Sequence, residues 1–140
     1  MASRSSYDPD VLSPPAPERP RPSWPVKFAV AFRGLKLGVR GHSSFFVHFF
    51  FSALVVVAAV VLRCGLTEWC LLLGCIGLVL TAELFNSALE TLVRGLDGPT
   101  RQRVWPCLDV AAGAVLLASL TAAVVGSLVF LRQLLGAMGN

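Results

Sequence analysis

Three long apolar segments dominate the pattern of hydrophobic and polar positions along the chain. Residues 45–62 contain no Asp, Glu, Lys or Arg, and residues 110–131 contain no charged side chain at all. Residues 69–93 begin equally apolar and then continue through Glu83 and Glu90 without an interrupting proline. A helix needs about 20 mostly apolar residues, or slightly fewer when its ends snorkel, to cross a ~30 Å hydrocarbon core. The pattern therefore predicts three membrane-spanning helices.

The segment 26–41 has a different, two-sided pattern. Apolar residues recur at helical spacing on one face and basic residues on another, and these are Phe28, Phe32, Leu35 and Val39 against Arg33, Lys36 and Arg40. An apolar stripe of this kind sinks into the headgroup boundary while the cations meet anionic lipid phosphates. We therefore expect an amphipathic interfacial helix, with a soluble surface helix as the alternative.

The composition is typical of a membrane protein. The 140 residues are 55% hydrophobic and only 14% charged, with a mean hydropathy of +0.70, and a soluble domain of this size cannot bury so much apolar surface. Residues 1–25 differ, because they hold seven of the nine prolines together with Ser, Arg, Asp and Glu. Such a segment builds no core and lacks the apolar stretch of a signal peptide. We expect a disordered tail followed by an all-α membrane domain over residues 26–140.

Basic side chains are concentrated on one side of the predicted membrane helices. Of the 12 Lys and Arg residues, ten lie in the tail, in the segment 26–41 or in the loop 94–106, and only Arg63 and Arg132 lie on the opposite side. Since cytoplasmic segments carry an excess of Lys and Arg, we expect a multi-pass protein of the cell inner (cytoplasmic) membrane with a cytoplasmic N-terminus. These cations flank apolar runs, so the basic pI does not indicate a nucleic-acid partner.

Three polar residues share one face of the helix predicted over residues 69–93. Glu83, Asn86 and Glu90 follow one another at i, i+3 and i+7, which places them on the same side of a helix. A carboxylate in a membrane helix costs about 2.5–3.5 kcal/mol at the bilayer centre on insertion scales and therefore usually has a function. We expect Glu83 in the inner leaflet near the headgroups and Glu90 in cytoplasmic water.

Carboxylates at these depths are suited to phosphorylating a lipid. At the position of Glu83 a carboxylate is able to take the proton of a lipid hydroxyl, and at Glu90 it is able to hold the magnesium ion of a nucleotide. The alternatives are a buried Glu83 bonded to a neighbouring helix and a Glu90 at a solvated helix end. Asp109 is either an acid favoured by the dipole of the next helix or a nucleotide contact at the level of Glu90.

Three separated motifs resemble one known family. The run AELFNSALETLV, which contains Glu83 and Glu90, is similar to the signature of the prokaryotic diacylglycerol kinase family, which includes the undecaprenol kinases of Gram-positive bacteria. KFAVAFRGLKLGVR resembles that family's interfacial helix, and DVAAGAVLLAS resembles the start of its third membrane helix in the undecaprenol-type branch. The resemblance extends without gaps from about Val26 to Leu131.

The resemblance implies a small membrane lipid kinase that forms a homotrimer with composite sites at the cytoplasmic interface. Its substrates would be ATP, with Mg²⁺ as cofactor, and a membrane lipid alcohol, either diacylglycerol or undecaprenol. By position, Glu83 matches the general base, Asn86 an orienting amide and Glu90 a carboxylate that binds the metal and the nucleotide. Further positions that match nucleotide or lipid contacts are Asp109, Lys36 and Gly34.

The chain departs from the family pattern at several of these positions. His42 and Ser44 replace a second metal-binding Glu and an Asn, Leu108 replaces a Lys, and Arg94 replaces an Asp. His42 is then a possible substitute ligand, although imidazole is a poor ligand for magnesium. Two interpretations follow: an active kinase that uses Arg94 or Arg101 on the phosphates, or a relative without turnover that acts as a membrane scaffold. A small proton-coupled transporter with Glu83 as its membrane carboxylate is a third.

Overall fold

The computed structural model describes residues 23–41 and 43–138, and every regular element in this part of the chain is a helix. The predicted all-α class is therefore confirmed. Two earlier expectations, a disordered tail over most of residues 1–25 and a metal ligand at His42, lie outside the described residues. The helices are α1 Trp24–Gly41, α2 Ser43–Val61, α3 Leu66–Arg94, α4 Gly98–Val104 and α5 Pro106–Met138.

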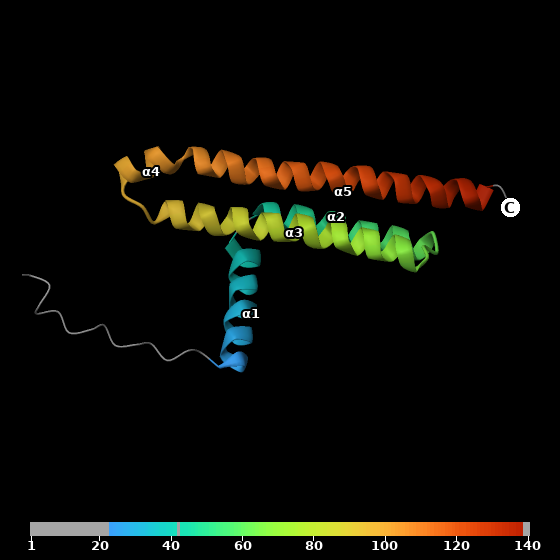
Figure 1. Cartoon of the computed structure of the whole chain (residues 1–140), viewed down its shortest axis with the longest axis horizontal. Helices are drawn as coiled ribbons and strands as arrows, with labels where there is room; N and C mark the ends of the chain where they lie inside the picture. Colours follow the sequence, from blue (N-terminus) through green and yellow to red (C-terminus); the bar gives the residue numbers. More distant parts are fainter. Residues whose placement is uncertain (1–22, 42, 139–140) are drawn as a thin grey trace, which may run out of the picture.

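Helix α3 is the centre of the arrangement. It packs against α5 along much of its length and against α2 on another side, so that α2, α3 and α5 lie side by side (Figure 1). Towards the turn between α2 and α3, the three helices enclose a small apolar core of buried residues, namely Ala59, Cys64, Leu72 and Val129. By length and composition, α3 and α5 are each able to cross a bilayer, whereas the apolar part of α2, Phe45–Val61, is shorter.

Helix α1 begins two residues earlier than the segment that we predicted. It starts at Trp24, and the carbonyl of Ser23 accepts the hydrogen bond of the Lys27 backbone N–H at 3.1 Å. Pro25 does not prevent this, because a proline in the first helical turn sacrifices no intrahelical hydrogen bond. The ammonium of Lys27 also lies 4.6 Å from the centre of the Trp24 ring, a favourable cation–π contact.

Helix α4 occupies the segment 94–106, where we predicted a loop. Gly95 does end α3, but Asp97 then caps a new helix by accepting a 3.3 Å hydrogen bond from the Thr100 backbone N–H, with Pro99 in the first turn. Both are ordinary signals of a helix start. Hydrogen bonding from the side chain and backbone of Thr100 lowers the pKa of Asp97. The cap therefore stabilises the fold above the ordinary pKa of aspartate and weakens as the pH falls through the lowered value.

The other helix bounds differ from the predicted ones at their ends. Helix α3 starts at Leu66, three residues before the predicted start, with Glu68 in its first turn, where an acid is favoured by the helix dipole. Helix α5 runs from Pro106 to Met138 and so extends beyond the predicted range 110–131 at both ends. The helix continues through Arg132, since arginine is a good helix former, and its guanidinium lies 3.6 Å from Glu68 of α3.

Helix α1 leaves the bundle crosswise to the other long helices (Figure 1). Gly38 lies at its contact with α3, where a β-carbon would lie 2.5 Å from Cδ2 of Leu84, so that the leucine side chain would have to move. One turn earlier, Gly34 has no neighbouring atom within 4 Å of such a carbon. The absence of a side chain at Gly38 thus allows α1 to approach α3 one residue away from Glu83.

We predict that Gly38→Val destabilises the protein by about 1–3 kcal/mol, the usual cost of overpacking, because the valine displaces Leu84. The matched control is Gly34→Val, which introduces the same side chain one turn away into open space. Thermal unfolding in detergent micelles, followed by circular dichroism, compares the two. Equal losses in both variants would mean that helix propensity and not the contact with Leu84 determines the effect.

Candidate active site

The buried polar side chains of the described chain lie together on α3. They are Glu83, Asn86 and Ser87, and Glu83 is only 2% exposed. Their spacing brings them to the side of α3 that faces the other helices, as the helical periodicity predicted for Glu83 and Asn86. Because a buried carboxylate is costly unless other groups compensate its charge, this cluster is the strongest candidate for a functional site.

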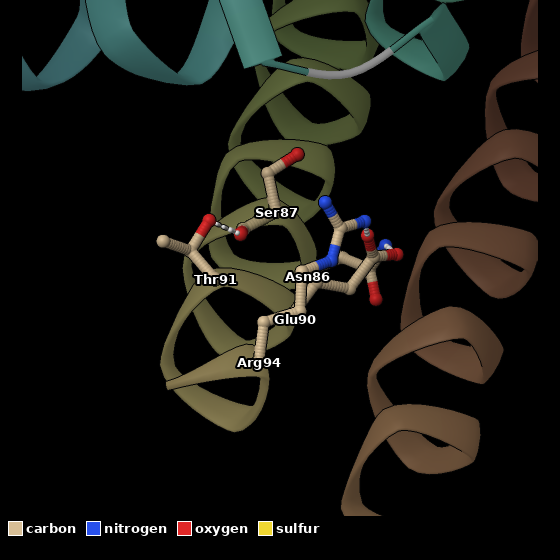
Figure 2. Close-up of polar contacts among 5 residues, drawn as sticks. All are labelled: Asn86, Ser87, Glu90, Thr91 and Arg94. Carbon is tan, nitrogen blue, oxygen red and sulfur yellow. Dashed lines mark hydrogen bonds and ion pairs between the residues drawn. The ribbon is translucent and has the colours of Figure 1, made fainter. Parts of the chain in front are cut away.

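A row of polar side chains continues from this cluster towards the end of α3 (Figure 2). The amide of Asn86 donates a 3.1 Å hydrogen bond to Oε1 of Glu90, and the guanidinium of Arg94 donates a 3.1 Å hydrogen bond to Oε2. Each partner lies four residues from the next, one helical turn apart. The Glu90 side chain is 31% exposed, so it lies at the boundary between the buried cluster and the surface.

Ser87 and Thr91 lie beside this row but do not join it. The hydroxyl of Thr91 donates a 2.9 Å hydrogen bond to the backbone carbonyl of Ser87, and the Ser87 side chain points away from Glu90 (Figure 2). The buried Oγ of Ser87 has no hydrogen-bond partner among the described residues. Ser87 thus lies on the same buried face, but its hydroxyl takes no part in the row formed by Asn86, Glu90 and Arg94.

A histidine on the neighbouring helix lies close to Glu83. Nε2 of His48, on α2, lies 3.8 Å from Oε2 of Glu83, and the histidine side chain is 22% exposed. The sequence analysis did not connect these two residues. A histidine inside an otherwise apolar segment was the available signal, but helical periodicity relates residues within one helix and cannot relate α2 to α3.

The end of α3 forms a pocket together with α4 and α5. This cavity of about 380 Å³ is lined by Glu90, Val93, Arg94, Arg101, Trp105 and Leu108. Arg101 shapes it, because its Nη2 donates 2.9 Å hydrogen bonds to the carbonyls of Arg94 and Leu96. The Arg94 carbonyl is one of those that the end of α3 leaves without an intrahelical partner, and Leu96 lies just beyond that end, so Arg101 ties the end of α3 to α4.

The structure does not bring together in one site all the residues that the resemblance suggested as nucleotide or lipid contacts. Asp109 lies in the first turn of α5 as predicted, but it is exposed, and its neighbour Leu108 lines the pocket instead. On α1, Lys36 is exposed and Gly34 has open space around it. Within residues 23–41 and 43–138, no group of three or more His, Cys, Asp or Glu side chains is close enough to hold a metal ion.

Comparison with known proteins identifies the family. The profile described as "Prokaryotic diacylglycerol kinase" matches residues 29–130, which include α3 with its buried cluster. The chain belongs to the prokaryotic diacylglycerol kinase family. This confirms the resemblance seen in the three motifs, and the family indicates a lipid kinase.

Two curated relatives support the same family. The chain is 33% identical over 118 residues to a diacylglycerol kinase of Synechocystis sp., an alignment that covers 84% of this chain and 67% of the relative. It is 27% identical over 107 residues to an undecaprenol kinase of Bacillus subtilis, covering 76% of this chain and 87% of the relative. No solved structure matches the chain significantly. Members of the prokaryotic diacylglycerol kinase family thus include enzymes named for two different lipid alcohols.

We predict that Arg101→Ala destabilises the protein by about 1.5–3 kcal/mol, the usual range for hydrogen bonds that involve a charged group, because two carbonyls near the end of α3 lose their donor. Arg103→Ala is the matched control, since Arg103 is exposed on the same short helix, and surface changes of this kind usually stay within about 0.5 kcal/mol. Thermal unfolding of both variants in the same detergent is the measurement. If they unfold at the same temperature, Arg101 does not stabilise the end of α3.

Proposed function

We propose that the protein is a membrane-embedded lipid kinase that transfers the γ-phosphate of ATP to a lipid alcohol, diacylglycerol or undecaprenol. The observation that carries the proposal is the buried Glu83 carboxylate, followed on the same helix by the hydrogen-bonded pair Asn86 and Glu90. At 1.5 Å per residue, Glu83 and Glu90 are about 10 Å apart along the helix. This spacing suits a lipid hydroxyl at the first carboxylate and a phosphate group nearer the second.

Glu83 is the proposed general base. Phosphoryl transfer needs alignment and charge stabilisation more than covalent chemistry from the protein, but the attacking hydroxyl must lose its proton. A carboxylate that is 2% exposed is shielded from competing water and is placed to take that proton. The adjacent amide of Asn86 keeps the Glu90 side chain in place through its 3.1 Å hydrogen bond.

Glu90 is the proposed magnesium ligand. Mg²⁺ is usually bound through one or two carboxylates together with substrate phosphates and waters, so the Glu90 carboxylate fits this role although the described residues contain no larger cluster. When bound, the ion would neutralise charge on the phosphates. The ion pair with Arg94 competes for the same carboxylate, and Arg94 would have to move from Glu90 towards the phosphates. His42, which lies outside the described residues, remains a proposed second ligand.

The pocket at the end of α3 is the proposed phosphate site. It contains Arg94 and Arg101 but the apolar Leu108 where the family pattern has a lysine. The Nε of Arg101 is buried and has no hydrogen-bond partner among the described residues, so a phosphate oxygen would supply the acceptor that it lacks. We propose that the two arginines replace the charge of the missing lysine.

A homotrimer would complete the site. Asp109, Gly34 and Lys36 are all exposed in the single chain, and a neighbouring copy would bring such residues to the nucleotide. Large apolar residues are also exposed along α2 and α5, among them Phe49, Val57, Leu117 and Leu128. In a membrane these side chains face either lipid or another subunit.

We further propose that α2, α3 and α5 all cross the inner membrane and that α1 lies in its cytoplasmic interface. The crosswise direction of α1 relative to the bundle (Figure 1) is the direction that such a helix needs. Helix α2 is short for a span, but the terminal side chains of a short helix reach the interface by snorkelling. The excess of basic residues before α2 and between α3 and α5 supports a cytoplasmic N-terminus and a cytoplasmic α4.

We predict that Glu83→Gln lowers the rate of lipid phosphorylation by about 10²–10⁴-fold, the usual contribution of a general base, because the amide fills the same volume but cannot accept the proton. Purified protein is incubated with labelled ATP and either diacylglycerol or undecaprenol in mixed micelles. Glu68→Gln is the control, since it makes the same change on the same helix beside Arg132. A wild-type rate for Glu83→Gln would exclude Glu83 as the base, and an inactive wild type would favour the scaffold hypothesis.

We predict that a reporter fused after Asn140 lies outside the cytoplasm and that one inserted between Gly95 and Asp97 lies inside, because the excess of Lys and Arg favours a cytoplasmic loop and the single span α5 separates it from the C-terminus. Fusions active only on one side of the membrane measure this directly. The reverse pattern would remove Glu90 from cytoplasmic ATP and contradict the proposed kinase. A C-terminal reporter in the cytoplasm, with the loop also in the cytoplasm, would contradict the third span.

A further inference from the structure

The carboxylate of Glu83 and the imidazole of His48 face each other across a gap. Their nearest atoms, Oε2 and Nε2, are 3.8 Å apart, which is longer than a direct N–H···O hydrogen bond of about 2.7–3.2 Å. The two groups come from different helices, α3 and α2, and Glu83 is almost completely buried. The pair is therefore close enough for one small polar group to touch both side chains.

One hydroxyl oxygen is able to bridge these two atoms. An oxygen about 2.7 Å from Oε2 and about 2.9 Å from Nε2 forms a triangle on the observed 3.8 Å base. A hydroxyl both donates and accepts, so it donates to the carboxylate and accepts from the imidazole in the tautomer that carries its proton on Nε2. A group that only accepts hydrogen bonds cannot donate to the carboxylate.

The surroundings of His48 indicate what carries the hydroxyl. His48 lines a cavity of about 350 Å³ between α2, α3 and α5, whose other walls are mainly apolar, for example Val55, Ile76 and Val79. Ser52 also lines it, but its hydroxyl donates a 2.8 Å hydrogen bond to the carbonyl of His48. Cys75 is the other titratable side chain on the cavity wall. His48 therefore belongs both to this mainly apolar cavity and to the pair with Glu83, which is not among the residues that line the cavity. An alcohol whose apolar chain lies in the cavity would reach Glu83 past the imidazole.

We propose that His48 binds the hydroxyl of the lipid alcohol and holds it against Glu83. This inference rests on the proposed kinase function and adds a second residue to its acceptor site. The hydroxyl O–H bond breaks and its proton moves to Oε2 of Glu83, while the oxygen forms a bond to the γ-phosphorus of the nucleoside triphosphate. The bond from that phosphorus to the β-phosphate oxygen breaks, and the nucleoside diphosphate leaves with the electron pair. His48 transfers no proton and fixes the oxygen before attack.

Two substitutions of His48 separate its hydrogen bond from its packing. His48→Phe keeps a ring of similar size without a donor, and His48→Gln keeps an N–H donor near the position of Nε2. We expect His48→Phe to weaken binding of the alcohol and to raise its KM about tenfold, the effect of one lost hydrogen bond. His48→Gln should stay within about threefold of wild type, and the KM for ATP should not change in either variant.

The experiment measures binding and turnover with two short-chain probes, dioctanoylglycerol and farnesol, each given as a mole fraction in detergent micelles. Binding without ATP is measured by titration, and turnover by transfer from labelled ATP. Thr121→Val is the control, because the Thr121 hydroxyl is exposed and bonds only to the Leu117 carbonyl within α5. Comparison of the two probes shows whether a diglyceride or a prenol is the better ligand.

The outcomes distinguish this inference from the proposed function. If Glu83→Gln is inactive but His48→Phe binds and phosphorylates both alcohols as wild type does, the role of His48 is wrong and the kinase function stands. If wild type binds an alcohol in a His48-dependent way but phosphorylates neither, the kinase function is wrong and the hydroxyl site stands. Equal losses in His48→Phe and His48→Gln, or no binding by wild type, overturn the inference. Should His48→Phe fail to fold, His48→Met tests the same loss of a donor.

Discussion

The burial of one carboxylate between apolar helices is the constraint on which the rest of this structure depends. Glu83 is 2% exposed in a chain that is 55% hydrophobic, and an isolated buried charge of this kind is strongly unfavourable. The packing of α3 against its neighbours therefore has to bring a polar group to it, and α2 brings His48. Helix α1 reaches α3 at the same level because Gly38 has no side chain to keep it from Leu84.

Helix α3 lies partly among apolar helices and partly at the surface, and its composition changes accordingly along its length. Its first part is apolar and packs against α2 and α5, whereas its last turns carry Glu90 and Arg94 in a partly exposed row. The end of such a helix leaves carbonyls without partners. Arg101 on α4 binds the carbonyls of Arg94 and Leu96, so the short helix that follows α3 is tied to its end and forms one wall of the pocket beside Glu90.

Two of the departures from the family resemblance, Arg94 and Leu108, line that pocket. An arginine stands at position 94, where the family usually has an acidic residue, and the structure shows it paired with Glu90. Leu108 turns an apolar side chain into a site where a lysine is usual, and Arg101 lies in the same cavity. The pocket thus carries its positive charge on α3 and α4. Glu83 and Asn86 match the motif on which the family resemblance rests.

The sequence by itself determined the all-α class, the approximate positions of the four long helices and the shared face of Glu83, Asn86 and Glu90, because each of these depends on periodicity within one segment. The family, too, was recognisable from motifs along the chain. Helix α4 was missed although Asp97 and Pro99 are ordinary start signals, since the glycines around them indicated only the end of α3. Only the tertiary structure paired His48 with Glu83 and Arg101 with the end of α3, and only it left Asp109 exposed. These relations depend on how separate helices pack against each other, which the spacing of residues within a helix does not encode.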